Sequence, residues 1–261
     1  MRLDLYITEK GLAKSREQAK ELIKSGKVLV NGKVTAKPAF DVTDADTIEI
    51  TGDTLKYVGR GGLKLEKAIS EFEIDLEGRV CIDIGASTGG FTDCMLQSGA
   101  AFVYAADVGH GQLDEKLKGD IRVLNMEGTD IRNLTAESFE RSPDFISADV
   151  SFISLRLILP KISELLPEKG ESVVLIKPQF EAGRSAIGKN GIVKDKKDHI
   201  RVLEEITLFC PSVGMWVQKI VPSPITGGSG NREYLAHLKK GGESSDFDFK
   251  KIVSSAFNEV Y

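Results

Sequence analysis

One stretch of the sequence decides the fold: Asp83-Ile84-Gly85-Ala86-Ser87-Thr88-Gly89-Gly90-Phe91. It continues an apolar run that begins at residue 79 and is typical of a buried parallel strand. Residues 91–96 then have the pattern of a helix start. A strand, a glycine turn and a helix in this order form the turn at which an α/β sheet holds a nucleoside-like ligand. Glycine lets the backbone approach the ligand, and the helix start offers free N–H donors. The stretch therefore predicts a cofactor-dependent enzyme rather than an adaptor.

From about residue 60 onward, apolar runs alternate with helical segments. Such alternation predicts a mostly parallel sheet that helices cover on both faces. The runs expected to form strands are 80–84, 102–107, 121–124, 145–148, 172–176, 216–221 and 234–238. We therefore expect an α/β domain of the Rossmann-like type with a seven-stranded sheet.

Residues 1 to about 50 predict a separate, small α+β module. Ser15 is a candidate N-cap of a helix, and Gln18 lies where a capping box needs it. The run 28–34 contains Asn31-Gly32, the signal of a tight hairpin turn, and 46–50 alternates like a further strand. The polar segment 51–54 is typical of a hinge. We therefore expect one domain over 1–52, a linker over 53–59 and a second domain over 60–261.

Composition excludes several classes of protein. Of the 261 residues, 41% are hydrophobic and 28% are charged, which is ordinary for a globular protein. No apolar run approaches the roughly 18 residues of a membrane span, and the N-terminus lacks the apolar core of a signal peptide. Three cysteines without a CxxC pair favour reduced thiols over disulfides or zinc. We therefore expect a cytoplasmic protein with neither a membrane span nor a metal site.

The net charge of −4 conceals a strongly basic segment. Between Lys10 and Lys37 there are eight basic and two acidic residues, an excess of six positive charges. Such a local excess attracts phosphates and predicts a surface that faces RNA. The residues expected to contact RNA are Arg2, Lys10, Lys14, Arg16, Lys20, Lys24, Lys27, Lys33 and, at the start of the second domain, Arg60.

The glycine turn favours S-adenosylmethionine over a nicotinamide dinucleotide. The second glycine of the G-x-G-x-x-G fingerprint is missing, which disfavours close approach of a pyrophosphate. Asp107 ends the next predicted strand, 22 residues after Gly85, where a carboxylate accepts hydrogen bonds from ribose hydroxyls. S-adenosylmethionine has a ribose and no pyrophosphate. The residues expected to bind it are Asp83, Gly85, Ala86, Ser87, Gly89, Gly90, Phe91, Asp107, Val108, Asp130 and Asp149.

The same turn has an alternative interpretation, the G-x-S-x-G nucleophile elbow of α/β-hydrolases with Ser87 as the nucleophile. That elbow normally follows several earlier strands, one of which supplies an oxyanion donor, whereas Ser87 follows the first strand of its domain. His199 and His237 are candidate bases, but His237 lies inside a predicted strand. The order of the elements therefore disfavours a hydrolase.

Four further charged residues are candidates for catalysis: Lys64, Asp149, Lys177 and Glu233. Asp149 and Lys177 follow directly on predicted strands, at the sheet edge where α/β folds bind ligands. A charge after an apolar run is also what a strand emerging into water shows, so each residue alone is ambiguous.

The N-terminal segment resembles the S4 RNA-binding fold through the runs 2–6, 15–19, 23–32 and 46–48. The four charged residues match the Lys-Asp-Lys-Glu tetrad of FtsJ-like ribose 2′-O-methyltransferases. This resemblance implies that all four surround one cleft beside the glycine-lined pocket. From Arg2 to about Leu238, the chain resembles the TlyA family, also called hemolysin A. The motifs that carry this resemblance are 60–65, 83–93, 107–113, 149–155 and 176–181. The sequence departs from the family pattern at Gly59, where we expect serine.

The resemblance implies cytidine 2′-O-methylation of ribosomal RNA with S-adenosylmethionine, and ribosomal RNA or ribosomal subunits as partners. A neutral hydroxyl must lose its proton as it attacks the sulfonium methyl. Lys177 is the candidate base or alkoxide stabiliser, tuned by Lys64, Asp149 and Glu233. Two other interpretations compete. One is an RNA- or ribosome-binding protein that keeps the fold without catalysis, and the other is a membrane-active hemolysin, for which no obvious membrane-facing helix is found.

Overall fold

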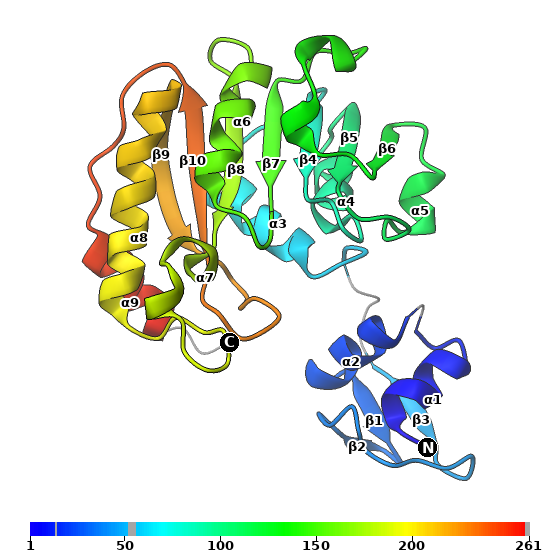
Figure 1. Cartoon of the computed structure of the whole chain (residues 1–261). Helices are drawn as coiled ribbons and strands as arrows, with labels where there is room; N and C mark the ends of the chain where they lie inside the picture. Colours follow the sequence, from blue (N-terminus) through cyan, green and yellow to red (C-terminus); the bar gives the residue numbers. More distant parts are fainter. Residues whose placement is uncertain (14, 52–55, 259–261) are drawn as a thin grey trace. The chain divides into compact units, whose positions relative to one another are not determined.

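The computed structural model describes residues 1–13, 15–51 and 56–258, and the chain divides into two compact units. Unit 1 is Met1–Lys56 and unit 2 is Tyr57–Tyr261 (Figure 1). The division falls inside the predicted linker 53–59, whereas most of the predicted hinge 51–54 lies outside the described residues. Each unit buries its own apolar side chains.

Unit 1 packs two helices on a small antiparallel sheet. The helices are α1 (Leu3–Glu9) and α2 (Arg16–Lys24), and the strands β1 (Val28–Val30), β2 (Lys33–Val34) and β3 (Ile48–Ile50) pair in the order β2-β1-β3. Ser15 Oγ accepts a hydrogen bond from the backbone N–H of Gln18 at 3.2 Å, so the predicted helix cap is present. Asn31 and Gly32 have positive φ angles of 52° and 74°, as the tight hairpin turn requires. The predicted α+β module is confirmed.

Unit 2 is built on a seven-stranded sheet with the order β6-β5-β4-β7-β8-β10-β9. The strands from β6 to β8 run parallel, whereas β10 is antiparallel to both β8 and β9. The strands are β4 (Val80–Ile84), β5 (Phe102–Asp107), β6 (Val123–Glu127), β7 (Phe145–Ala148), β8 (Glu171–Ile176), β9 (Met215–Pro222) and β10 (Tyr234–Lys240). The predicted Rossmann-like sheet is confirmed.

The prediction for β6 was the least accurate, because the predicted run 121–124 begins two residues too early and ends three residues too early. The Asp120 carboxylate accepts a hydrogen bond from the Arg122 N–H at 2.9 Å, which closes a turn over these residues. Ile121 is 94% exposed in that turn. Pairing with β5 therefore starts only at Val123.

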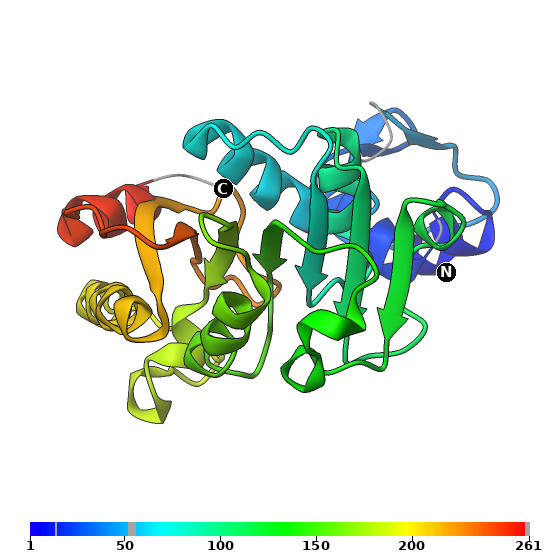
Figure 2. The ribbon, with the colours of Figure 1, turned by 90° about the horizontal axis from the view of Figure 1, so that it is seen from above.

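Helices cover both faces of the sheet, as Figure 2 shows. The helices α3 (Gly61–Phe72), α4 (Gly90–Gln97) and α5 (Glu115–Lys118) share one core, and α6 (Leu159–Leu165), α8 (Lys196–Phe209) and α9 (Phe249–Asn258) share the other. Successive strand residues point to opposite faces, so Cys81 of β4 packs in the first core and Ile82 in the second. The short helix α7 (Pro178–Glu181) begins just after β8.

The topology brings distant residues to one edge of the sheet. Parallel strands end at the same edge, so the residues after β4, β5, β7 and β8 meet there. Because β10 is antiparallel to β8, with Tyr234 opposite Ile176, it begins at that edge. Asp149, Lys177 and Glu233 thus converge although they are far apart in the sequence.

Candidate active site

The turn after β4 is shaped by three residues with positive φ angles, Gly85 (82°), Ser87 (49°) and Gly89 (93°). Glycine at position 85 is also required for space, because a Cβ there would lie 2.5 Å from the carbonyl oxygen of Asp149. The turn therefore packs directly against the end of β7, and this contact places the glycine backbone next to Asp149.

Asp83 lies beneath this turn and has no exposed surface. Its carboxylate accepts hydrogen bonds from the N–H and hydroxyl of Thr92, at 2.9 and 2.7 Å, and from Ser147 Oγ at 3.1 Å. Burial raises the pKa of Asp83 to about 7, against the opposing effect of these hydrogen bonds. Asp83 therefore ties the first turn of α4 to β4 and β7 and supports the glycine turn from below.

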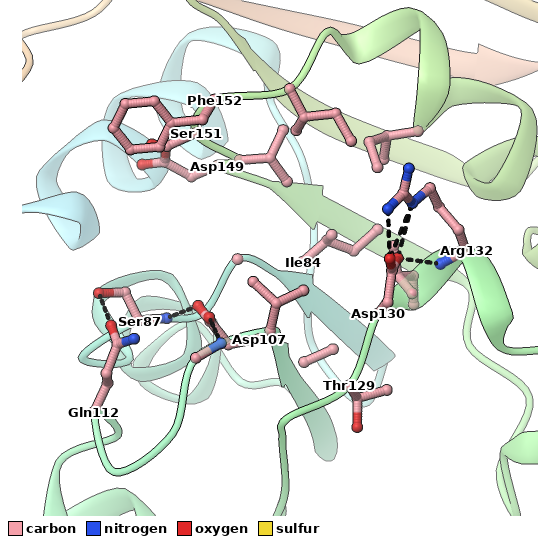
Figure 3. A pocket seen from close by; sticks show the side chains of 18 residues that line it. Ile84, Ser87, Asp107, Gln112, Thr129, Asp130, Arg132, Asp149, Ser151 and Phe152 are labelled. Atoms are coloured by element: carbon pink, nitrogen blue, oxygen red, sulfur yellow. Dashed lines mark hydrogen bonds and ion pairs between the residues drawn. The ribbon is translucent and has the colours of Figure 1, made fainter.

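A cavity of about 490 Å³ opens at the ends of β4, β5 and β7 (Figure 3). Asp107 fixes its shape, because the carboxylate accepts hydrogen bonds from the N–H groups of Ser87 at 2.8 Å and Gly109 at 2.7 Å. Ser87 Oγ in turn donates to Gln112 Oε1 at 3.2 Å. The apolar part of the lining consists of Ile84, Ala106, Val108, Ile131, Val150, Phe152, Ile153 and Ile158. A mostly apolar cavity with a few fixed polar groups is the usual form of a small-molecule site.

The predicted cofactor residues divide into two groups. Those that line the cavity are Gly85, Ser87, Asp107, Val108, Asp130 and Asp149. Those that lie outside its lining are Asp83, Ala86, Gly89, Gly90 and Phe91. Gly89 and Gly90 are needed for close packing instead. A Cβ on Gly89 would overlap the side chain of Leu117, and a Cβ on Gly90 would lie 2.9 Å from the backbone nitrogen of Gly62.

Four polar lining residues were not predicted from the sequence: Gln112, Thr129, Arg132 and Ser151. Arg132 forms an ion pair with Asp130, whose carboxylate lies 2.6 Å from the guanidinium, and this contact lowers the pKa of Asp130. The signal that could have found these residues is position, because all four follow the carboxyl ends of parallel strands: Gln112 follows β5, Thr129 and Arg132 follow β6, and Ser151 follows β7.

Lys64, Asp149, Lys177 and Glu233 form one connected cluster, the tetrad. Lys64 Nζ lies 2.8 Å from Glu233 Oε2 and 3.3 Å from Asp149 Oδ2, and Lys177 Nζ lies 2.6 Å from Asp149 Oδ1. Lys177 Nζ also donates to Ser151 Oγ at 2.9 Å. The expected convergence of the four side chains is present, with Lys64 reaching the others from the first turn of α3.

The tetrad sets two lysine side chains against two acidic side chains in a largely buried place. Burial opposes the charge of Lys64, but Asp149 and Glu233 outweigh this effect and raise the pKa of Lys64. Burial likewise opposes the charge of Asp149, yet Lys64 and Lys177 lower the pKa of Asp149. Lys64 therefore stays an ammonium group near neutral pH, and it provides a fixed positive charge next to Asp149.

A second cavity, of about 360 Å³, lies on the other side of the tetrad. Lys64, Lys177 and Glu233 line it, whereas Asp149 lines the first cavity. Ser151 and Phe152 line both cavities and so mark the boundary between them. Phe152 has a positive φ angle of 63° and is 92% exposed. The tetrad thus lies between two adjoining cavities that can hold two reactants next to each other.

The basic residues predicted to contact RNA in unit 1 differ in their surroundings. Arg2 and Arg16 both pair with the buried carboxylate of Asp4, at 3.0 and 2.9 Å. The hydrogen bond from Arg2 contributes most to lowering the pKa of Asp4 to about 2. These two arginines hold unit 1 together as well as presenting charge, a role that the sequence did not indicate.

Among the other predicted RNA contacts, Lys10 pairs with Asp44 at 3.1 Å and Lys20 with Glu17 at 3.1 Å. Both pairs are at least partly exposed, and such pairs are readily exchanged for other partners. Lys24, Lys33 and Arg60 are exposed, and Lys27 is half-buried. Lys14 lies outside the described residues.

Two further expectations concern metals and membranes. Within residues 1–13, 15–51 and 56–258, no group of three or more His, Cys, Asp or Glu side chains is placed to hold a metal ion. No helix in the described part of the chain is long and apolar enough to cross a membrane. The hydrolase interpretation finds no support, because Ser87 Oγ bonds to Gln112 and the buried His199 bonds to Tyr234.

Comparison with known proteins identifies both units. The FtsJ-like methyltransferase family model matches residues 57–240, and the S4 domain model matches residues 1–48. A Bacillus subtilis protein provisionally named the rRNA methyltransferase YqxC is 48% identical over 94% of this chain and 88% of its own length. The 16S/23S rRNA (cytidine-2'-O)-methyltransferase TlyA of Mycobacterium tuberculosis is 41% identical over 91% of this chain and 89% of its own length. A solved structure from Streptococcus thermophilus, provisionally described as a hemolysin, has a TM-score of 0.81 and 46% identity over 99% of this chain and 96% of that one.

Proposed function

The chain belongs to the FtsJ-like methyltransferase family and, with its S4 domain, to the TlyA group within it, and from this premise we propose that it methylates ribose 2′-hydroxyls of cytidines in ribosomal RNA. S-adenosylmethionine is the methyl donor, and the reaction takes place in the cytoplasm on RNA within ribosomal subunits. One observation carries the proposal: Lys64, Asp149, Lys177 and Glu233 form one cluster between two adjoining cavities.

The first cavity fits S-adenosylmethionine by the chemistry of its lining. Asp107 provides a carboxylate for ribose hydroxyls, and Asp130 provides an acceptor for the adenine amino group beside the apolar Ile131. Gly85 presents backbone without a side chain to the cavity, where the methionine part can approach it closely. When bound, S-adenosylmethionine supplies a methyl group on a positively charged sulfur.

The tetrad supplies the proton chemistry on the acceptor side. The hydroxyl oxygen forms a bond to the methyl carbon as the carbon–sulfur bond breaks, and the hydroxyl proton passes to Nζ of Lys177. The amine form of Lys177 accepts this proton. Lys64 places positive charge on the other side of Asp149, while Asp149 and Ser151 hold the Lys177 side chain in place. Holding oxygen and methyl about 3 Å apart supplies much of the acceleration.

Unit 1 supports RNA as the substrate. Its basic residues, among them Lys24 and Lys33, are exposed, and S4 domains are expected to bind structured RNA mainly through charge and shape. Unit 2 supplies the chemistry, and unit 1 increases the affinity for the RNA that carries the acceptor ribose.

The test is to incubate the protein with labelled S-adenosylmethionine and unmodified ribosomal subunits, and then to map the methylated riboses. We expect label at a cytidine 2′-oxygen. Absence of transfer, together with failure to bind S-adenosylmethionine in calorimetry, would instead support a protein that binds RNA and has lost catalysis.

Two substitutions of Lys177 test the assigned proton step. Lys177→Ala should abolish methylation while S-adenosylmethionine affinity changes little, because Lys177 lines the second cavity only. Lys177→Arg keeps the positive charge but has no neutral form at accessible pH, so it should be equally inactive. If Lys177→Arg remains active, the residue stabilises the alkoxide by its charge and does not accept the proton.

A further inference from the structure

A short hairpin forms part of the wall of the second cavity. Ile187 and Val193 form an antiparallel bridge, the Gly188 N–H donates to the Ile192 carbonyl at 3.0 Å, and the Gly191 N–H donates to the Gly188 carbonyl at 2.9 Å. Ile187 and Gly191 line the cavity beside Lys177 and Glu233. Lys189 lies at the tip of this hairpin, two residues from each of the two lining positions, and so lies at the rim of the cavity.

Asn231 fixes the hairpin to the strand that carries Glu233. The Asn231 side chain is 3% exposed, accepts from the Val193 N–H at 3.1 Å and donates to the Gly191 carbonyl at 2.9 Å. The Asn231 carbonyl also accepts from the Gly227 N–H at 2.9 Å, which closes the loop on the opposite wall. Asn231 is two residues from Glu233, so the hairpin position is coupled to the position of the tetrad.

His199 fixes the same hairpin from behind. The buried His199 Nε2 lies 3.0 Å from the Val193 carbonyl oxygen, and Nδ1 lies 2.8 Å from the Tyr234 hydroxyl. A carbonyl can only accept, so Nε2 carries the proton and Nδ1 accepts from Tyr234. Burial lowers the pKa of His199, which keeps the ring neutral. The hairpin is therefore a fixed wall of the cavity.

The hairpin and the residues around it carry a concentration of positive charge. The exposed cations of this segment are Arg184, Lys189, Lys194, Lys196 and Lys197. Its one exposed carboxylate, that of Asp195, caps α8 by accepting from the Lys197 N–H at 2.9 Å. Within the part of the chain that the structure describes, Lys189 and Lys194 make no ion pair with another side chain. Their charge is available for a ligand.

We propose that the hairpin Ile187–Val193, with Lys189 at its tip and Lys194 at its base, binds the phosphates that flank the acceptor ribose. This inference rests on the proposed function, because it needs an RNA strand whose 2′-hydroxyl reaches Lys177. Once that ribose occupies the second cavity, the phosphates on either side of it must lie at the rim. The hairpin places the ammonium group of Lys189 at this rim and that of Lys194 at the hairpin base, on a backbone that Asn231 ties to the strand leading to Glu233.

The test compares full-length wild-type protein with the double variant Lys189→Ala/Lys194→Ala. Binding to unmodified ribosomal subunits is measured by filter retention over a salt series, without a methyl donor, and methyl transfer is measured in parallel. Loss of two contacts to single-stranded phosphates should reduce the slope of log affinity against log salt by about 1.4. In low salt the KM for subunits should rise about tenfold or more, with kcat and S-adenosylmethionine affinity unchanged.

The control variant is Lys169→Ala/Lys239→Ala, which also removes two lysines. Both residues lie at the opposite end of the sheet, Lys169 before the start of β8 and Lys239 near the end of β10, and should leave the slope unchanged. An unchanged slope in the hairpin variant, or an equal decrease in both variants, would overturn the inference. Because binding is measured without methyl transfer, this result is independent of whether the wild-type protein proves to be a methyltransferase.

Discussion

Replacing Lys64 with methionine should separate the structural contribution of the tetrad from its chemistry. Lys64 Nζ lies 2.8 Å from Glu233 and 3.3 Å from Asp149, and the exposed fractions of the Lys64 and Glu233 side chains are 9% and 3%. Methionine keeps much of the length and apolar stem of lysine. The substitution therefore removes a buried positive charge and changes the packing little.

The expected loss of unfolding free energy is about 3 kcal/mol, at the low end of the range for breaking a buried ion pair. The loss is at the low end because both carboxylates retain a partner in the variant. Asp149 still pairs with Lys177 at 2.6 Å, and Glu233 still accepts a hydrogen bond from the side-chain amide of Gln179 at 3.1 Å. Glu233→Gln alone should cost about 1 kcal/mol, since Lys64 retains Asp149. In the double variant no charge is left without a partner, and stability should return to within about 1 kcal/mol of wild type.

Urea unfolding followed by tryptophan fluorescence measures this cycle in the relevant unit. The chain contains one tryptophan, Trp216, and it lies in β9 beside β10. The signal thus reports unit 2 and is unaffected by independent unfolding of unit 1. All three variants should lack methylation, although the double variant is nearly as stable as wild type.

The reasoning would be refuted by a Lys64→Met variant that loses less than about 1 kcal/mol, or by single effects that simply add in the double variant. Either result would mean that the Glu233 carboxylate is not left as an unpaired buried charge when Lys64 is removed, because water or a movement of α3 solvates it. A double variant that still methylates RNA would remove Lys64 from the proposed chemistry.

Four other changes give independent tests. Asp83 has a folded-state pKa of about 7 against an ordinary 3.8, so its contribution to stability is complete below about pH 4 and is lost as pH rises through about 7, by about 4 kcal/mol in total. Asp83→Asn should flatten the wild-type decline in urea unfolding free energy between those pH values, and parallel curves for the two proteins would contradict the assignment. Gly85→Ala should weaken S-adenosylmethionine binding in calorimetry and lower the free energy of unfolding by about 2 kcal/mol or more. Gly78→Ala is the control, because Gly78 has a similar positive φ but open space around it, so its free energy of unfolding should fall only by the cost of holding alanine at a positive φ. Phe152→Ala should raise the KM for RNA about tenfold through lost stacking with little change in stability, and an unchanged KM would exclude contact with the nucleotide. Deleting residues 1–51 should lower RNA affinity and its salt dependence in filter binding, and a truncated chain that binds like the full chain would remove unit 1 from substrate recognition.

The sequence predicts the sheet well because a buried strand needs a run of apolar residues, and such runs are visible in the sequence. Most strands of unit 2 are short runs of apolar residues, and charged residues at or just after a strand end, such as Asp107 at the end of β5 and Lys177 after β8, mark the edge where the strands end. The tetrad was predicted from the family resemblance, not from spacing, because Lys64 and Glu233 are 169 positions apart and only the folded sheet brings them together.

The different roles of the individual glycines in the turn after β4 could not be predicted from the sequence. A glycine that faces a ligand and a glycine that permits close packing are identical in a sequence, so Gly85 and Gly89 were assigned alike. The same holds for Arg16, which matches a phosphate-binding residue in its sequence context and yet pairs with Asp4, 12 positions away. Such roles depend on neighbours that are set by tertiary contacts.

The antiparallel course of β10 has a consequence for the order in which this protein becomes functional. On a translating ribosome, the N-terminal parts of a chain emerge and fold first. The residues that surround the first cavity, from Ile84 to Ile158, are all synthesised at least 75 residues (233 minus 158) before Glu233 is added. The tetrad is therefore complete only when the segment that leads into β10 has joined the sheet, so the chain acquires its proposed proton chemistry in the last stage of folding.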